Sequence, residues 1–359
     1  MNWIRALVIG TLMLGCMVTM IRGDEAEAGG AKKFYIALDT NPAHFRNRIV
    51  SNFVNELKKT TGTELDIRVF HSGQLFKGRD ELKGLAWGNI QMAVPGILSL
   101  SRFETNLNLF TLPAFYGLPY SVMRQLANGP TFKRLNNRIE QNLPVKVIGP
   151  YLELGYLDTF SVGSPVRSVA DYAGMKVRVP GGAADIVRYK LLGANPVAIP
   201  FADVPLALSQ GGVDGISSSY ETVKSGLLWD TGLLYAFEDR AAYFLYIPLV
   251  SDIFWQQASP RIREAILDAW SRTATKGQEY AEEQQQMAKA EFIRHGGQVI
   301  VPDQMELEKK RQELLSSTPR IIQQLDMDST LVSQAIEEID NYLKDHPLSH
   351  TTIGKGAAE

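Results

Sequence analysis

Arg178 is the side chain whose type and position point most directly to ligand chemistry. The segment GMKVRVPGG, residues 174–182, alternates apolar and basic residues like a half-buried strand and ends in Pro-Gly-Gly before a helix expected over residues 183–192. Ligands of α/β proteins bind beyond the carboxyl ends of strands, where a helix start also offers backbone N–H groups. An arginine there can hold a carboxylate through two parallel hydrogen bonds. This favours a carboxylate clamp over a solvated charge at a sheet edge.

A second polar cluster, ISSSYE at residues 216–221, also follows a predicted strand. Its candidate ligand contacts are Ser217, Ser218, Tyr220 and Glu221. A strand-to-helix loop whose serines cap the next helix explains the same residues equally well. The cluster alone therefore leaves both interpretations open.

The motifs of common enzymes are missing from the sequence. It contains no G-x-S-x-G, H-E-x-x-H, Walker A or G-x-G-x-x-G motif. The single cysteine, Cys16, lies in the N-terminal apolar run, so we expect no thiolate site in a mature chain. We predict no enzyme activity, no cofactor and no metal. An exported enzyme whose catalytic groups converge from distant segments is the alternative from another class.

The elements that position these residues alternate between strands and helices. Strands are predicted around residues 34–38, 65–69 and 90–94, and Phe45, Ile49, Phe53 and Leu57 mark the core face of the first helix. The order strand, helix, strand predicts mixed sheets covered by helices. The 359 residues, 45% of them hydrophobic, suffice for two lobes. One long helix is expected over residues 260–295, long enough to brace both.

The N-terminus has the pattern of an export signal. Arg5 precedes an apolar run, and Ala26-Glu27-Ala28 supplies a cleavage site, so residues 1–28 are predicted to be a cleaved signal peptide. Acylation of Cys16 to give a lipoprotein is the minority alternative. The formal net charge of −2 gives no reason to expect a nucleic-acid partner.

Several motifs together resemble the solute-binding proteins of tripartite ATP-independent periplasmic (TRAP) transporters, the family typified by C4-dicarboxylate binders. They are HSGQL, GNIQMAV, LPAFYG, GMKVRVPGG, LLGANPVAIPFADVPLALSQGGVDG and YFLYIPLVSDIFWQQASP, in this order. The resemblance covers essentially the whole mature chain. It implies an α/β, two-lobed periplasmic-binding-protein fold with mixed sheets, strands crossing between lobes and a long lobe-spanning helix.

The resemblance also implies domain boundaries and a partner. Lobe I is expected at residues 29–152 with a return at 241–267, and lobe II at residues 153–240. Residues 268–345 would hold the spanning helix and complete lobe II, leaving residues 346–359 as a tail. The chain would be periplasmic and deliver its solute to a two-component membrane permease. An ABC importer or a sensor kinase is the alternative partner.

In the family, the arginine matching Arg178 pairs with the solute carboxylate. This chain departs from the pattern at Leu157, where many relatives have a second arginine, and at Ser217 to Ser219, where an asparagine is usual. The loss of a second cation favours one carboxylate on a neutral aromatic or hydroxylated body.

Further contacts are expected around that body. By resemblance, Phe201, Ser218, Tyr220 and Glu221 would flank the solute, although Phe201 follows an apolar strand and could equally belong to the core. Asn41 and His44 stand where a strand gives way to a helix and could reach the cleft, although helix capping and surface exposure explain them as well.

Overall fold

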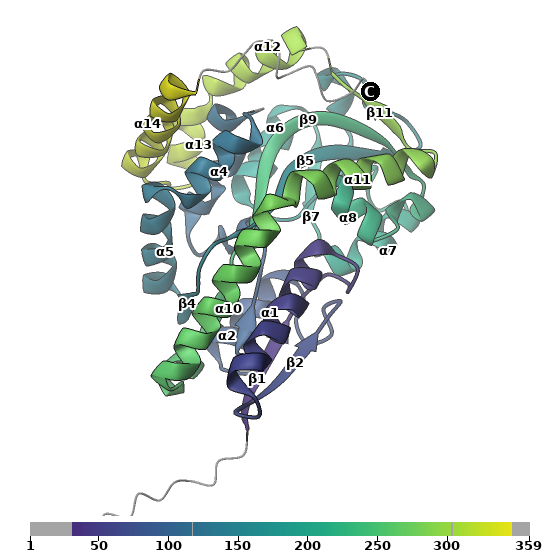
Figure 1. Ribbon diagram of the computed structural model, residues 1–359. Helices are drawn as coiled ribbons and strands as arrows, with labels where there is room; N and C mark the ends of the chain where they lie inside the picture. The colour runs from purple at the N-terminus through teal and green to yellow at the C-terminus, as the bar shows by residue number, and fades with distance from the viewer. Residues whose placement is uncertain (1–30, 117, 303, 347–359) are drawn as a thin grey trace, which may run out of the picture.

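The computed structural model describes residues 31–116, 118–302 and 304–346 and contains two mixed sheets covered by helices (Figure 1). The predicted signal peptide, Cys16 and most of the predicted tail lie outside these residues. None of the helices within these ranges combines the length and the apolar character needed to cross a bilayer.

The first sheet forms the core of the first lobe and has the order β2-β1-β3-β10-β4. β1 runs parallel to β2 and β3, whereas β10 is antiparallel to β3 and β4. Its strands are β1 (Lys32–Ala37), β2 (Leu65–Phe70), β3 (Met92–Ala93), β4 (Val145–Val147) and β10 (Leu249–Ser251).

The second sheet forms the second lobe and has the order β11-β9-β5-β8-β6-β7. β6, β7 and β8 are parallel to one another, and β5 is antiparallel to both β8 and β9. Its strands are β5 (Leu152–Val162), β6 (Lys176–Val179), β7 (Asn195–Ala198), β8 (Gly215–Ser218), β9 (Leu233–Tyr246) and β11 (Gln298–Ile300).

Two strand connections join the lobes. β4 of the first sheet leads into β5 of the second, and β9 leads back into β10. The apolar run around Tyr246 divides between β9 and β10 at Ile247 and Pro248. A proline has no N–H to donate to the sheet, which accounts for the break.

The helices of the first lobe cover its sheet. The predicted stripe of α1 is its core face, since Phe45, Ile49, Phe53 and Leu57 are all buried. These helices are α1 (Phe45–Thr61), α2 (Glu81–Ala86), α3 (Ile97–Leu100), α4 (Tyr120–Asn128), α5 (Pro130–Asn142) and α9 (Asp252–Gln257), with the 3-10 turns η1 (Gly78–Asp80), η2 (Thr105–Thr111) and η3 (Pro113–Phe115).

The second lobe has two apolar cores. One includes residues of β8, α7, α8 and α11, and the other residues of β6, α6 and η4. The helices are α6 (Ala183–Leu191), α7 (Val204–Ser209) and α8 (Tyr220–Ser225), with the 3-10 turns η4 (Val169–Tyr172), η5 (Phe201–Asp203) and η6 (Leu228–Thr231).

The expected spanning helix is a bent pair, α10 (Pro260–Glu279) and α11 (Ala281–Arg294). The two helices meet at Tyr280, whose φ of −106° and ψ of 0° depart from helical values. α10 packs on α1 in the first lobe, and α11 packs on α8 and β5 in the second (Figure 1). Each helix follows the lobe that it covers, which accounts for the bend between them.

The C-terminal helices differ from the sequence-based expectation, which placed them on lobe II. α14 packs on α4 and α5, and α12 contacts both η3 and η4. Leu331, Val332, Ala335 and Ile339 of α14 are buried at helical spacing and join the core of the first lobe. The three helices are α12 (Gln304–Leu315), α13 (Thr318–Gln324) and α14 (Ser329–Asp345).

Candidate functional site

A cavity of about 550 Å³ lies between the two lobes. Residues that follow the carboxyl ends of β1 and β6 line it, together with the last two residues of β8. This is where an α/β protein places a ligand. Five of the sequence-predicted residues line the cavity: Leu157, Arg178, Phe201, Ser217 and Ser218.

Arg178 is 4% exposed, and within the described part of the chain no carboxylate lies within ion-pair distance of it, while Asp39 and Asp185 act on it from farther away. Its Nε donates to the carbonyl of Ile199 at 2.8 Å and its Nη1 to the carbonyl of Ser217 at 3.4 Å. Burial lowers the pKa of Arg178 to about 10, while the Asp39 carboxylate opposes the shift. The guanidinium is therefore a buried cation at neutral pH.

The turn after Arg178 brings the second lobe against the first. Gly182 has a φ of 86°, which favours glycine, and a Cβ there would lie 3.1 Å from the Leu98 side chain. α6 begins directly after this turn. One of its first N–H groups, that of Ala184, donates to Asn108 at 3.2 Å, so the helix start is partly satisfied before any ligand arrives.

The serines at the end of β8 have different roles. Ser217 is fully buried, and its Oγ has no hydrogen-bond partner among the described residues. Ser219 caps α8, because its Oγ accepts from the Thr222 N–H at 3.2 Å. The capping interpretation thus applies to Ser219, and the cavity is lined by Ser217 and Ser218.

The wall of the cavity is largely apolar. Leu157 of β5 is 3% exposed, and Leu98, Leu154 and Phe244 also line the space. Phe201 is half-buried: it lines the cavity and also packs against the second lobe's core.

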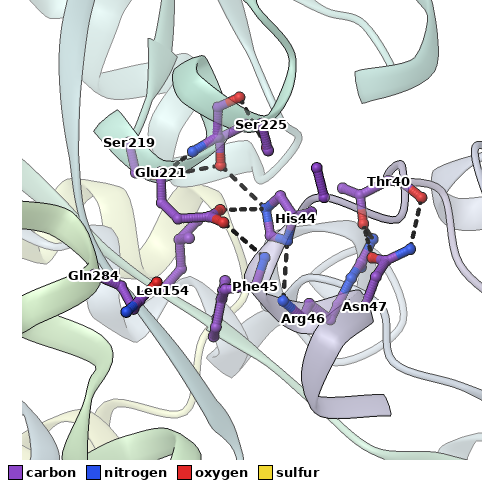
Figure 2. Close-up of polar contacts among 12 residues, drawn as sticks. Thr40, His44, Phe45, Arg46, Asn47, Leu154, Ser219, Glu221, Ser225 and Gln284 are labelled. Carbon is purple, nitrogen blue, oxygen red and sulfur yellow. Dashed lines mark hydrogen bonds and ion pairs between the residues drawn. The ribbon is translucent and has the colours of Figure 1, made fainter. Parts of the chain in front are cut away.

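Three other predicted residues join the lobes beside the cavity. The Glu221 carboxylate accepts from the Phe45 N–H at 2.7 Å and lies 3.3 Å from His44 Nε2 (Figure 2). His44 is fully buried and caps α1 by accepting from the Arg46 N–H at 3.2 Å, so surface exposure does not explain it. Asn41 donates to the carbonyl of Ser225 at 2.6 Å. Asn41, His44 and Glu221 thus hold the lobes together.

The surroundings of this junction shift both titratable groups. Burial raises the pKa of Glu221 to about 7. Burial also lowers the pKa of His44 well below its usual value, and the charges of Arg46 and Arg48 add to that shift. We infer that His44 is neutral at physiological pH.

Tyr220 belongs to the core of the second lobe rather than to the cavity wall. Its hydroxyl donates to Glu238 at 2.9 Å, and its ring contacts Phe160 and Phe292. Because α8 begins at Tyr220, the side chain turns away from the end of β8.

Sequence reasoning missed several charged residues of the cavity: Asp39, Lys77, Arg79, Asp80 and Arg102. Asp39 could have been found, because it comes directly after the first predicted strand. Arg178 was found from the same kind of position, at the end of its own predicted strand. The others lie in loops or short turns, where no periodic pattern indicates direction. No group of three or more metal-binding side chains occurs in the described ranges.

A sequence profile of the bacterial extracellular solute-binding proteins of family 7 matches residues 39–324. The 2,3-diketo-L-gulonate-binding periplasmic protein YiaO of Escherichia coli (strain K12) is 22% identical over 245 residues, 67% of this chain and 72% of that protein. The C4-dicarboxylate-binding periplasmic protein DctP of Rhodobacter capsulatus is 24% identical over 243 residues, 66% and 70% of the two chains.

The fold is also similar to that of a solved structure. The sugar acid binding protein DctPAm of Advenella mimigardefordensis, in complex with galactonate, superposes with a TM-score of 0.81. The match covers 87% of this chain and 99% of that chain, at 16% identity. The matched profile spans most of the chain, and the two-lobed fold agrees with it. The chain therefore belongs to the bacterial extracellular solute-binding proteins of family 7, which confirms its resemblance to TRAP solute-binding proteins.

Proposed function

We propose that the chain is a periplasmic receptor that captures a small organic monocarboxylate in the cavity between its lobes. Arg178 pairs with the carboxylate, Ser217 and Ser218 add hydrogen bonds, and Leu157 and Phe201 contact the body of the solute. Closure of the lobes is held by Asn41, His44 and Glu221. The loaded receptor then delivers the acid to a two-component TRAP permease in the membrane.

The observation that carries this proposal is the buried guanidinium of Arg178, which has carbonyl oxygens as partners and no acid among the described residues. A buried cation without a counter-charge is costly, and a ligand carboxylate removes that cost. The planar guanidinium can also donate two parallel hydrogen bonds to the two oxygens of a carboxylate. A singly charged anion that lacks such a pair of oxygens cannot accept both.

One further observation supports a single carboxylate, and another supports an organic acid in general. Leu157 places an apolar side chain, 3% exposed, where the resemblance to TRAP solute-binding proteins implies a second arginine. The similar proteins carry a sugar acid, a C4-dicarboxylate or 2,3-diketo-L-gulonate in their names, so an organic acid is common to them.

A thermal-shift screen of the purified chain against organic acids, sugar acids and aromatic carboxylates tests the proposal. A solute at ~100 times its dissociation constant stabilises the folded state by ~2.7 kcal/mol, which a melting curve resolves. We expect a shift confined to one class of carboxylates and abolished by Arg178→Ala. Arg167→Ala, which removes an exposed arginine of the same lobe, is the matched control. Shifts that Arg178→Ala leaves intact would contradict the clamp.

A further inference from the structure

Asp39 lines the cavity, and one of its two carboxylate oxygens accepts no hydrogen bond from the described residues. The residue follows β1, lines the cavity and has a side chain that is 16% exposed. Its Oδ1 accepts a hydrogen bond from Arg46 Nη2. Within the described ranges no donor lies at hydrogen-bond distance from Oδ2. This oxygen lies near Gly78, which also lines the cavity: a Cβ added to Gly78 would be 4.0 Å from it. An ionised carboxylate accepts hydrogen bonds only.

Arg46 fixes the orientation of this carboxylate. The Arg46 side chain is fully buried, donates to the carbonyl of Val94 at 2.8 Å and to Thr40 Oγ1 at 2.6 Å, and lies 4.4 Å above the Tyr246 ring. Arg46 therefore has little freedom to move. Asp39 is therefore held in one orientation, and the positive charge of Arg46 offsets its negative charge.

The charges around the cavity restrict the charge of the ligand. Asp39 and Arg46 balance each other, and Arg178 adds one positive charge. Glu81 is fully buried and lies close enough to Asp39 and Arg46 for the charges of both to act on its carboxyl. Burial raises the pKa of Glu81 well above its usual value, and the charge of Asp39 adds to that shift, which favours the neutral form of this carboxyl. The inner cavity therefore complements a ligand with a single negative charge.

We propose that Asp39 is a specificity-determining residue, which accepts a hydrogen bond from a hydroxyl group of the solute whose carboxylate lies on Arg178. The ligand class is then the hydroxycarboxylates. This inference rests on the proposed function, because it takes the position of the solute carboxylate from Arg178.

Two other acid classes fit the cavity less well. A second carboxylate would face Asp39 and be repelled, unless it reached the exposed Arg79 and Arg102 at the rim. An ammonium group would bind Asp39, but an amino acid of zero net charge would leave the net positive charge of Asp39, Arg46 and Arg178 uncompensated. A neutral hydroxyl satisfies Asp39 and leaves the charges balanced.

Calorimetric titration with four acids of six carbons tests the inference: D-gluconate, hexanoate, adipate and 6-aminohexanoate. The acids share chain length and differ in hydroxyls, in a second carboxylate or in an ammonium group. We expect gluconate to bind about tenfold more tightly than hexanoate or better, as for a hydrogen bond to a charged group. Adipate and 6-aminohexanoate should bind more weakly than gluconate.

Variants of Asp39 test whether this residue makes the distinction. Asp39→Asn keeps an oxygen for Arg46 and removes the negative charge, so the preference for gluconate over hexanoate should fall and adipate should gain affinity. The double variant Asp39→Ala with Arg46→Met removes the pair without leaving a buried charge unpaired. It should abolish the preference for gluconate and leave hexanoate affinity within about twofold, since no hydroxyl contact is lost. Asp268→Asn, at an exposed acid of α10 that does not line the cavity, is the control and should leave the preference unchanged.

The outcomes separate this inference from the proposed function. If gluconate binds no more tightly than hexanoate, or adipate or 6-aminohexanoate binds most tightly, Asp39 is not a hydroxyl acceptor. The same follows if the double variant weakens gluconate and hexanoate equally. In these cases the Arg178 clamp still stands, provided that Arg178→Ala weakens every acid that binds. If none of the four acids binds, or Arg178→Ala changes nothing, the proposed function fails and the inference fails with it.

Discussion

Three arginines are buried in the part of the chain that the structure describes: Arg46, Arg178 and Arg188. Arg46 pairs with Asp39, and Arg188 pairs with Asp185 at 2.8 Å. Arg178 is the one of the three whose partners are all carbonyl oxygens. Because pairing is the rule for buried arginines in this chain, the missing counter-charge of Arg178 is best explained by a ligand.

Leu157 gives a prediction about the choice between acids. The substitution Leu157→Arg places a second cation at the cavity, so we expect the ratio of adipate to hexanoate affinity to rise by about tenfold or more if the new charge pairs with the second carboxylate. Calorimetric titration of both acids measures the ratio. Leu157→Met, which keeps the site apolar, is the control. A variant that folds and keeps the original ratio would show that residue 157 does not face the solute.

Glu221 gives a prediction about pH. The pKa of its carboxyl is about 7 in the folded chain and has an ordinary value of 4.5. Because the folded group holds its proton to higher pH, the stability it contributes is present below pH 4.5 and is lost as pH rises through about 7. The lowered pKa of His44 acts in the opposite sense, reducing stability as pH falls through the ordinary value of 6.5.

The variant Glu221→Gln isolates the carboxyl. Relative to the unsubstituted chain, it should gain roughly 2 to 3 kcal/mol in free energy of unfolding between pH 5 and pH 8, because glutamine carries no charge to bury. Denaturant unfolding at the two pH values measures the difference. Glu264→Gln, at an exposed acid of α10, is the control. The contrary result is that the free energies of unfolding of Glu221→Gln and the unsubstituted chain differ by the same amount at both pH values. That result would mean that Glu221 does not titrate in this range.

At the scale of single residues, strand ends were the informative signal. Arg178 could be placed from sequence because its strand, its glycines and the following helix are all local patterns. Tyr220, Asn41 and His44 could not, since the partners that hold them, Glu238, Ser225 and Glu221, lie far away along the chain. A local pattern gives the position of a side chain but not the distant group that it meets.

At the scale of elements, the bent helix pair α10–α11 connects the lobes along β5. Trp270 donates to the carbonyl of Pro150 at 2.9 Å, Gln278 to that of Tyr151 at 2.9 Å, and Gln285 to that of Leu154 at 2.7 Å. The sequence predicted a continuous helix because Glu, Gln, Lys and Ala favour helix on both sides of Tyr280. The bend results from packing on two lobes, and helix propensity carries no information about such packing.

The glycine turn between β6 and α6 gives a prediction at this scale. Gly182→Ala adds a Cβ at a φ of 86°, 3.1 Å from the Leu98 side chain of the other lobe. Gly211→Ala adds a Cβ at a φ of 65° with nothing within 4 Å, and is the matched control. Gly211→Ala should lower the free energy of unfolding by about 1–2 kcal/mol. Gly182→Ala should lower it further, because the ψ of 122° at Gly182 lies outside the left-handed helical region.

Only Gly182→Ala should also weaken solute binding, because it pushes against the first lobe where the cavity closes. Unfolding by denaturant and calorimetric titration with the same acid separate the two effects. Equal affinities for the two variants would show that the contact between Gly182 and Leu98 does not contribute to closure.

At the scale of the whole molecule, polar contacts cross between the lobes around the cavity. They include Asn41 with Ser225 at 2.6 Å, Phe45 with Glu221 at 2.7 Å, and Lys77 with Asp203 at 2.7 Å. A solute in the cavity would therefore be enclosed by both lobes. The alternation of strands and helices predicted the two-lobed α/β fold. It did not predict that α14 packs on α4 and α5, because an amphipathic helix shows which face is buried and not what covers it.

The central claim is that a carboxylate binds Arg178 in the cavity between the lobes. A crystal structure of the chain with the acid that gives the largest thermal shift tests it most directly. The account predicts both carboxylate oxygens within hydrogen-bond distance of the Arg178 guanidinium, with Ser217 and Ser218 beside the solute. An acid bound outside the cavity, or one bound inside it with its carboxylate away from Arg178, would contradict the account.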